Sequence, residues 1–135
     1  MGDKRRTWIL LGRNIIWAAV IFILCTLPGD NIPDPHLNIP HLDKVVHFGM
    51  FFIMAVLLCN ELEYQTRFRL RKIYMITVVI AFLYGGAIEI LQQHCFSRSG
   101  DVWDLVADVF GAVTGCGVYP QLKRIVGRIR RGKKK

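Results

Sequence analysis

The stretch IYMITVVIAFLYGGAIEIL, residues 73–91, holds a single charged side chain, that of Glu89 near its end. A helix of this length rises about 28 Å, close to the ~30 Å hydrocarbon core of a bilayer. Three more apolar stretches of similar length occur, so the expected spans are about 8–27, 45–62, 73–91 and 102–122. Backbone groups in lipid must be hydrogen-bonded internally, which makes such stretches helical. The sequence therefore predicts an all-α polytopic membrane protein, a bundle of four transmembrane helices.

The composition of the chain agrees with this prediction. Its 135 residues favour a single domain over 1–135, 53% of them are hydrophobic, and the formal net charge is +8. In a small membrane protein, apolar spans contact lipid while basic ends contact the headgroups. A nucleic-acid-binding chain would instead spread its basic residues over a folded face, so we expect no nucleic acid partner.

The basic residues also predict an orientation. Fifteen Lys and Arg lie in the N-terminal tail, the 63–72 loop and the segment 123–135, whereas the other two loops hold Lys44 and Arg98 alone. By the positive-inside rule both termini are cytoplasmic, and residues 28–44 and 92–101 face outward. Residues 123–135 are expected to form a basic cytoplasmic tail that contacts anionic lipid.

The four cysteines are far apart and have no zinc-ligand spacing. Cys25 and Cys95 both fall on the expected outer side, so they could pair. The sequence alone does not place their Cβ atoms, which leaves this pairing open.

The fourth stretch carries an unusual acidic stripe. Asp101, Asp104 and Asp108 lie within about 60° of one another on a helix, and Gly111 and Gly115 continue the same stripe inward. A G-x-x-x-G pattern lets another helix approach closely, so the carboxylates should face a neighbouring helix. The same two glycines could also join two copies of the chain into a homo-oligomer.

Polar residues on two other helices are expected at the same membrane depth. Glu89, Gln92 and Gln93 share one face of the third helix, and Asp43, Lys44 and His47 begin the second. A carboxylate in a membrane interior costs several kcal/mol, roughly 2.5–3.5 on insertion scales, and usually marks function. We therefore expect a shared polar site at the outward face.

The charges within this site narrow its chemistry. The acids exceed the cations Lys44 and Arg98 by three if all ionise, so protons or a bound cation must compensate. Oxygen ligands with one imidazole suit Mg²⁺, Mn²⁺ or Ca²⁺ better than zinc, and Glu89, Asp104 and Asp108 are the candidate ligands. The alternative is an internal network in which Arg98, Lys44 and His47 pair with the acids.

Three blocks of residues resemble the VanZ-like family of small bacterial integral membrane proteins. They are DKVVHF at 43–48, EILQ at 89–92 and RSGDVWDLVADVFG at 98–111, and Asp108 stands where most of the family has Asn. The resemblance implies a multi-pass protein of the bacterial cytoplasmic (inner) membrane with a cell-envelope connection. The name-giving member is linked to teicoplanin resistance, and no reaction comes with the resemblance.

The favoured function is binding of the polar head of an envelope lipid or lipid-like molecule, with the ligand-binding residues Asp43, Lys44, Gln92, Gln93, Arg98 and Asp101. One alternative is a metal-dependent hydrolase or transferase acting on a lipid-linked phosphate, with catalytic residues His47, Glu89 and Asp104. Another is a proton-coupled carrier or flippase. Against the carrier, we expect no acidic residue in the cytoplasmic half of the spans.

Overall fold

The computed structural model describes residues 2–26, 41–95 and 101–132, which form four helices. They are α1 (Gly2–Thr26), α2 (Leu42–Gln65), α3 (Leu70–Cys95) and α4 (Val102–Gly132). Each is long and apolar enough to cross a membrane. The predicted all-α bundle of four transmembrane helices is thus confirmed.

The helices extend beyond the apolar stretches from which they were predicted. α2 begins at Leu42, α3 ends at Cys95, and α4 continues to Gly132, with Pro120 inside it. Helical hydrogen bonding does not stop where the apolar side chains stop, so polar residues at the headgroup level stay in the same helix. The basic segment that begins at Lys123 is therefore helical up to Gly132 and not an irregular tail.

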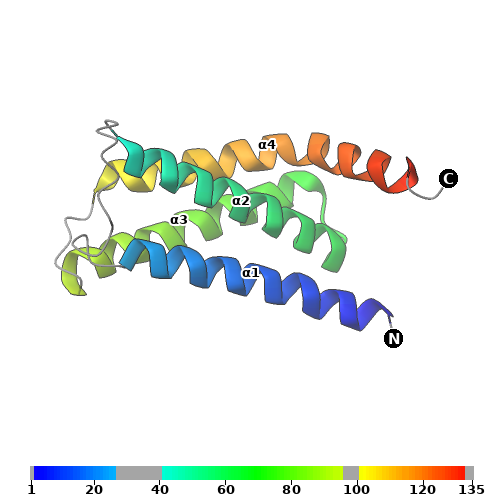
Figure 1. The fold of residues 1–135 in the computed structure, drawn as a ribbon, viewed down its shortest axis with the longest axis horizontal. Coiled ribbons are helices and arrows are strands. Elements are labelled where there is room, and N and C mark those ends of the chain that lie inside the picture. The colour runs from blue at the N-terminus through cyan, green and yellow to red at the C-terminus, as the bar shows by residue number, and fades with distance from the viewer. Residues whose placement is uncertain (1, 27–40, 96–100, 133–135) are drawn as a thin grey trace.

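The four helices lie along the long axis of an elongated bundle, and both termini lie at one end of it (Figure 1). At the opposite end α1 and α3 finish, and α2 and α4 begin. We call this opposite end the site end. The alternation of direction brings the start of α2, the end of α3 and the start of α4 close together there.

The packing of α2 on α4 is the most extensive in the bundle, and glycine makes it possible. A Cβ added at Gly111 would collide with the Phe48 carbonyl oxygen, and one at Gly115 would lie 2.6 Å from the Phe52 carbonyl oxygen. The expected close approach of another helix is confirmed, and that helix is α2 of the same chain. Because α2 covers this face, two copies of the chain would have to associate through a different surface.

Large apolar side chains cover the outside of the bundle. Trp8 on α1, Val45 on α2, Met75 on α3 and Trp103 on α4 are each 63–71% exposed. Apolar exposure of this extent on every helix is typical of a surface that contacts lipid.

Candidate functional site

Lys44, on the first turn of α2, is the centre of an ion-pair cluster at the site end. Its Nζ lies 2.6 Å from Asp101 Oδ2, 3.0 Å from Asp104 Oδ1 and 3.2 Å from Asp43 Oδ2. The ammonium group therefore joins the start of α2 to the start of α4. Three carboxylates surround one cation, so Lys44 has little capacity left to hold an anionic ligand.

Asp101 caps the N-terminus of α4 while it contacts Lys44. Its Oδ1 accepts a hydrogen bond of 2.9 Å from the Trp103 backbone N–H, as an N-cap carboxylate does. The hydrogen bond from Lys44, with that of the Trp103 N–H, holds the pKa of the Asp101 carboxyl below its ordinary value. The predicted ligand-binding residues Asp43, Lys44 and Asp101 are thus brought together as partners of one another.

His47 and Asp108 form a buried pair deeper in the bundle. His47 Nδ1 lies 2.9 Å from Asp108 Oδ1, and the two side chains are 7% and 1% exposed. The other ring nitrogen, Nε2, lies 4.0 Å from both Asp104 Oδ2 and Cys25 Sγ. Asp108 therefore orients the imidazole so that its second nitrogen points toward Asp104.

Glu89 connects α3 to the start of α4. Its Oε2 accepts a hydrogen bond of 2.9 Å from the Asp101 backbone N–H, whereas its Oε1 is buried and has no hydrogen-bond partner in the part of the chain that the structure describes. One Glu89 oxygen is thus used for positioning, and the other is available to a ligand. Asp108 Oδ2 is a second buried oxygen without a partner.

The remaining predicted residues differ in their placement. Gln92 is 2% exposed and donates a hydrogen bond to the Cys25 carbonyl oxygen, so it ties α3 to α1, whereas Gln93 is exposed. Arg98 lies outside the described residues. Cys25 is buried and Cys95 is exposed, and no disulfide joins them.

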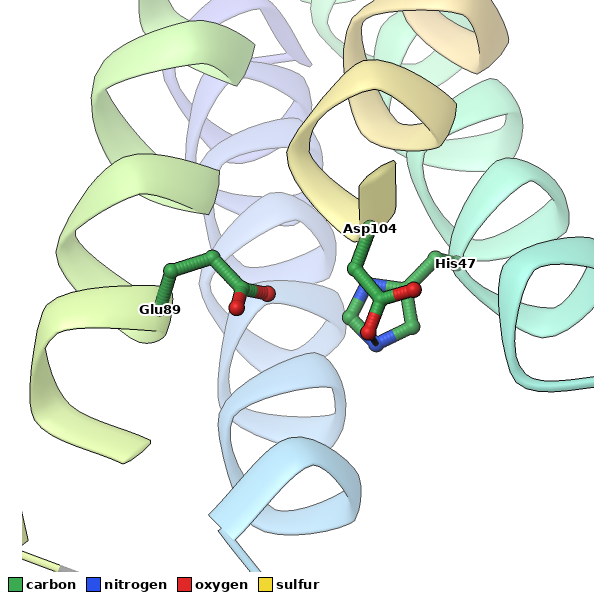
Figure 2. A group of neighbouring side chains, drawn as sticks. All are labelled: His47, Glu89 and Asp104. Carbon is green, nitrogen blue, oxygen red and sulfur yellow. Dashed lines mark ion pairs between the residues drawn. The ribbon is translucent and has the colours of Figure 1, made fainter. Parts of the chain in front are cut away.

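Two groups of side chains have the proximity that a metal ion requires. In one, a nitrogen of His47 and one oxygen each of Glu89 and Asp104 lie within 4.8 Å of one another. Figure 2 shows these three side chains pointing toward a common point from α2, α3 and α4. The other group is Asp43, Asp101 and Asp104, and all three carboxylates already contact the Lys44 ammonium. The predicted metal ligand Asp108 belongs to neither group, and its Oδ1 contacts His47 Nδ1.

A groove of about 480 Å³ lies between α3 and α4 beside this site. Glu89, Gln93 and Asp101 provide its polar end, and the rest of its lining is apolar or glycine: Phe82, Leu83, Gly86, Ala87, Ile90, Val102 and Leu105. Phe82, Leu83 and Ile90 are 51–63% exposed, so the groove opens sideways toward the lipid-facing surface.

A second polar cluster lies in the half of the bundle that carries the termini. Glu61 on α2 is 8% exposed and accepts hydrogen bonds from Asn14 of α1 and, at 2.8 Å, from Gln65. The expectation of no acidic residue in the cytoplasmic half of the spans is wrong. Glu61 lies within the second predicted span, so the sequence already contained this acid. Its partner Asn14 is a polar residue within the first predicted span, and that position was a signal for the contact.

The sequence profile of the VanZ/LLP1 family matches residues 8–125, a range that reaches into all four helices. The chain belongs to the VanZ/LLP1 family. Its three blocks at 43–48, 89–92 and 98–111 lie within the matched range, so the predicted family is confirmed.

This VanZ/LLP1 chain is also similar to the fission yeast protein called uncharacterized protein C11E3.10, from Schizosaccharomyces pombe. The two are 28% identical over 78 residues, which is 57% of this chain and 46% of the yeast protein. The chain thus matches about half the length of this curated relative. No solved structure matches it.

Proposed function

We propose that this VanZ/LLP1 protein binds a lipid or lipid-like molecule, with the polar head at Glu89 and the chain in the groove between α3 and α4. The observation that carries the proposal is the groove of about 480 Å³ whose polar end includes Glu89, a residue with one carboxylate oxygen that has no hydrogen-bond partner among the described residues. Ligand pockets are mostly apolar with a few converging polar groups, and this groove has that character. Its side opening gives a membrane lipid a route of entry.

The head group should carry hydrogen-bond donors or a positive charge. The polar end of the groove has the carboxylates of Glu89 and Asp101 and the amide of Gln93, and its lining holds no basic residue among residues 2–26, 41–95 and 101–132. Lys44, which the sequence suggested as an anchor for an anionic head, is held by three carboxylates. A bare phosphate would therefore meet net negative charge at this site.

The proposal is tested by filling the groove. Gly86 lines it, and a Cβ built there meets nothing within 4 Å, so Gly86→Leu places a side chain in the groove without a clash at its first atom. Gly117→Leu is the matched control, because Gly117 also has open space but lies on α4 away from the groove. Both proteins are purified in mild detergent, and bound lipid is measured by mass spectrometry.

We expect the native protein and Gly117→Leu to carry one enriched lipid class, and Gly86→Leu to lose it while keeping its thermal stability. Equal lipid content in all three proteins would contradict the proposal. Glu89→Gln should retain the chain but change which head groups are enriched, because the carboxylate becomes a neutral amide.

The outward location and the envelope connection are part of the same proposal. Twelve described basic residues lie at the opposite end of the bundle, in the start of α1, the α2–α3 connection, the start of α3 and the end of α4, and they support a site that faces away from the cytoplasm. The link to teicoplanin resistance rests on the family resemblance. It is tested by the teicoplanin sensitivity of a bacterial strain that expresses the native protein or Gly86→Leu. The match to a yeast protein favours a ligand defined by lipid chemistry over one restricted to bacterial walls.

A hydrolase or transferase is a second candidate, and the His47–Asp108 pair favours it. An aspartate that orients a histidine is a common arrangement for a general base. The reaction would release or transfer phosphate from a polyprenyl or glycerophospholipid substrate. Phosphate release that is lost in His47→Ala would support it, and equal release by both proteins would exclude His47 as the base.

A proton-coupled carrier is a third candidate, and the buried Glu61 favours it. Buried carboxylates in both halves of the bundle are what a proton relay uses. Acidification of vesicles that contain the native protein, absent in Glu61→Gln, would support it. The buried apolar side chains of Ile21, Phe51 and Met54 in the core weigh against a continuous path.

A further inference from the structure

We infer that His47, Glu89 and Asp104 form a binding site for a divalent transition cation such as Mn²⁺ or Zn²⁺, with Asp108 as the group that orients His47. The inference deepens the proposed function, because a cation at this point would let the head-group site accept a phosphate. One nitrogen and two oxygen ligands from three helices lie within 4.8 Å of one another.

Each of the three residues has one atom that positions it and a second that can bind a ligand. His47 uses Nδ1 for Asp108, Asp104 uses Oδ1 for Lys44, and Glu89 uses Oε2 for the Asp101 N–H. The second atoms are Asp104 Oδ2, Glu89 Oε1 and His47 Nε2, and this nitrogen lies 4.0 Å from both Asp104 Oδ2 and Cys25 Sγ, so a cation would replace its contact with the thiol. A ligand histidine whose other nitrogen contacts a carboxylate is the usual arrangement at protein metal sites.

The distances require only a small adjustment. A tetrahedral cation with bonds of about 2.1 Å separates two of its ligand atoms by about 3.4 Å, and His47 Nε2 and Asp104 Oδ2 lie 4.0 Å apart. Rotation of the Asp104 and Glu89 carboxylates would bring the ligand atoms, which lie within 4.8 Å of one another, to this separation. Three protein ligands leave further positions open for water or a head group.

The charge balance gives an independent reason for a cation. Asp43, Glu89, Asp101, Asp104 and Asp108 surround Lys44 and His47, so ionised carboxylates would outnumber cations by at least three in the described part of the site. Asp108, 1% exposed, and Glu89 also keep buried oxygens without a partner. A divalent ion would offset much of this excess in a medium that solvates charge poorly.

The ligand chemistry selects the class of metal. The sequence suggested Glu89, Asp104 and Asp108 with one imidazole, an oxygen-rich set for which Mg²⁺, Mn²⁺ or Ca²⁺ was expected over zinc. The structure puts the imidazole of His47 among the ligands in place of Asp108. An imidazole with two carboxylates favours Mn²⁺ or Zn²⁺ over Mg²⁺ and Ca²⁺.

The test is binding of MnCl₂ to the full-length protein in detergent after chelator treatment. Free Mn²⁺ is followed by electron paramagnetic resonance, and ZnCl₂ is added as a competitor. We expect about one bound Mn²⁺ per chain, displaced by Zn²⁺, and affinities lower by roughly tenfold or more in Glu89→Gln and Asp104→Asn. Asp43→Asn is the matched control, because Asp43 contacts the same Lys44 but does not belong to the group of His47, Glu89 and Asp104.

Circular dichroism checks that each variant is folded. No saturable Mn²⁺ binding by the native protein, or equal losses in Asp43→Asn and Glu89→Gln, would overturn the inference. The assay needs no lipid, so its outcome is separate from that of the proposed function. Gly86→Leu should lose the lipid and keep the Mn²⁺. If the chelator-treated native protein binds lipid but no Mn²⁺, the inference is overturned and the proposed function is not.

Discussion

Asp108 of α4 lies 2.9 Å from His47 of α2, and this buried contact joins the two helices that pack most extensively. Asp108 lies one helical turn further along α4 than Asp104, which pairs with Lys44. The two contacts therefore join α2 to α4 at two levels within the site. The deeper link sets the direction of the imidazole.

Two replacements of Asp108 should separate its effect on Mn²⁺ binding, through the orientation of His47, from its effect on the stability of the fold. In Asp108→Asn the amide oxygen can still accept a hydrogen bond from His47 Nδ1, so the fold should be retained while Mn²⁺ affinity falls about 10–100-fold. Asp108→Ala leaves His47 without its partner and should lower the unfolding free energy by about 1–3 kcal/mol. Thermal unfolding in detergent and the Mn²⁺ titration measure the two effects. Identical behaviour of the two variants would contradict this assignment.

The glycine contact between α2 and α4 should tolerate no side chain. Gly111→Ala forces a Cβ against the Phe48 carbonyl oxygen, so we expect a loss of about 1–3 kcal/mol in stability. Gly117→Ala, which meets open space, should be neutral or slightly stabilising because Ala favours a helix. Thermal unfolding of both variants tests the contact. A Gly111→Ala protein as stable as Gly117→Ala would show that the helices can separate at no cost.

The Lys44 cluster should make stability depend on pH. The pKa of Asp101 is lowered in the folded protein, so its contribution is present above the unfolded value of about 3.9 and is lost as the pH falls through the lower folded value. The melting temperature of the native protein should therefore drop below about pH 4. Lys44→Gln should melt lower at pH 7 and lose less on acidification. A steeper acid dependence in the variant would contradict the role of Lys44.

The orientation of the site can be tested with Cys95. It ends α3 at the site end and is exposed, whereas Cys25, Cys59 and Cys116 are buried. A membrane-impermeant maleimide should label Cys95 in intact cells if the site faces outward. In a Cys95→Ser background, Arg124→Cys at the other end should react only after permeabilisation. The reverse pattern would place the site on the cytoplasmic side.

The sequence was sufficient to predict the four spans and the meeting of Lys44, His47, Glu89 and Asp104, because helix length, direction and period place these residues at one end. It did not predict which polar groups pair. Asp108 and Asp104 share one stripe, yet one orients His47 and the other faces the candidate cation site. Gln92 and Gln93 are adjacent in sequence, but a rotation of about 100° buries one against α1 and exposes the other. Such differences depend on helix rotation, which packing decides.

The most direct test of lipid binding is to cross-link a photoactivatable phospholipid to the protein in bilayers and locate the cross-links by peptide mass spectrometry. The account predicts that they concentrate on the groove residues of α3 and α4, such as Leu83, Ala87 and Leu105, and disappear from these positions in Gly86→Leu. Cross-links spread evenly over exposed apolar residues around the bundle, including Ile15 and Val113, would contradict it.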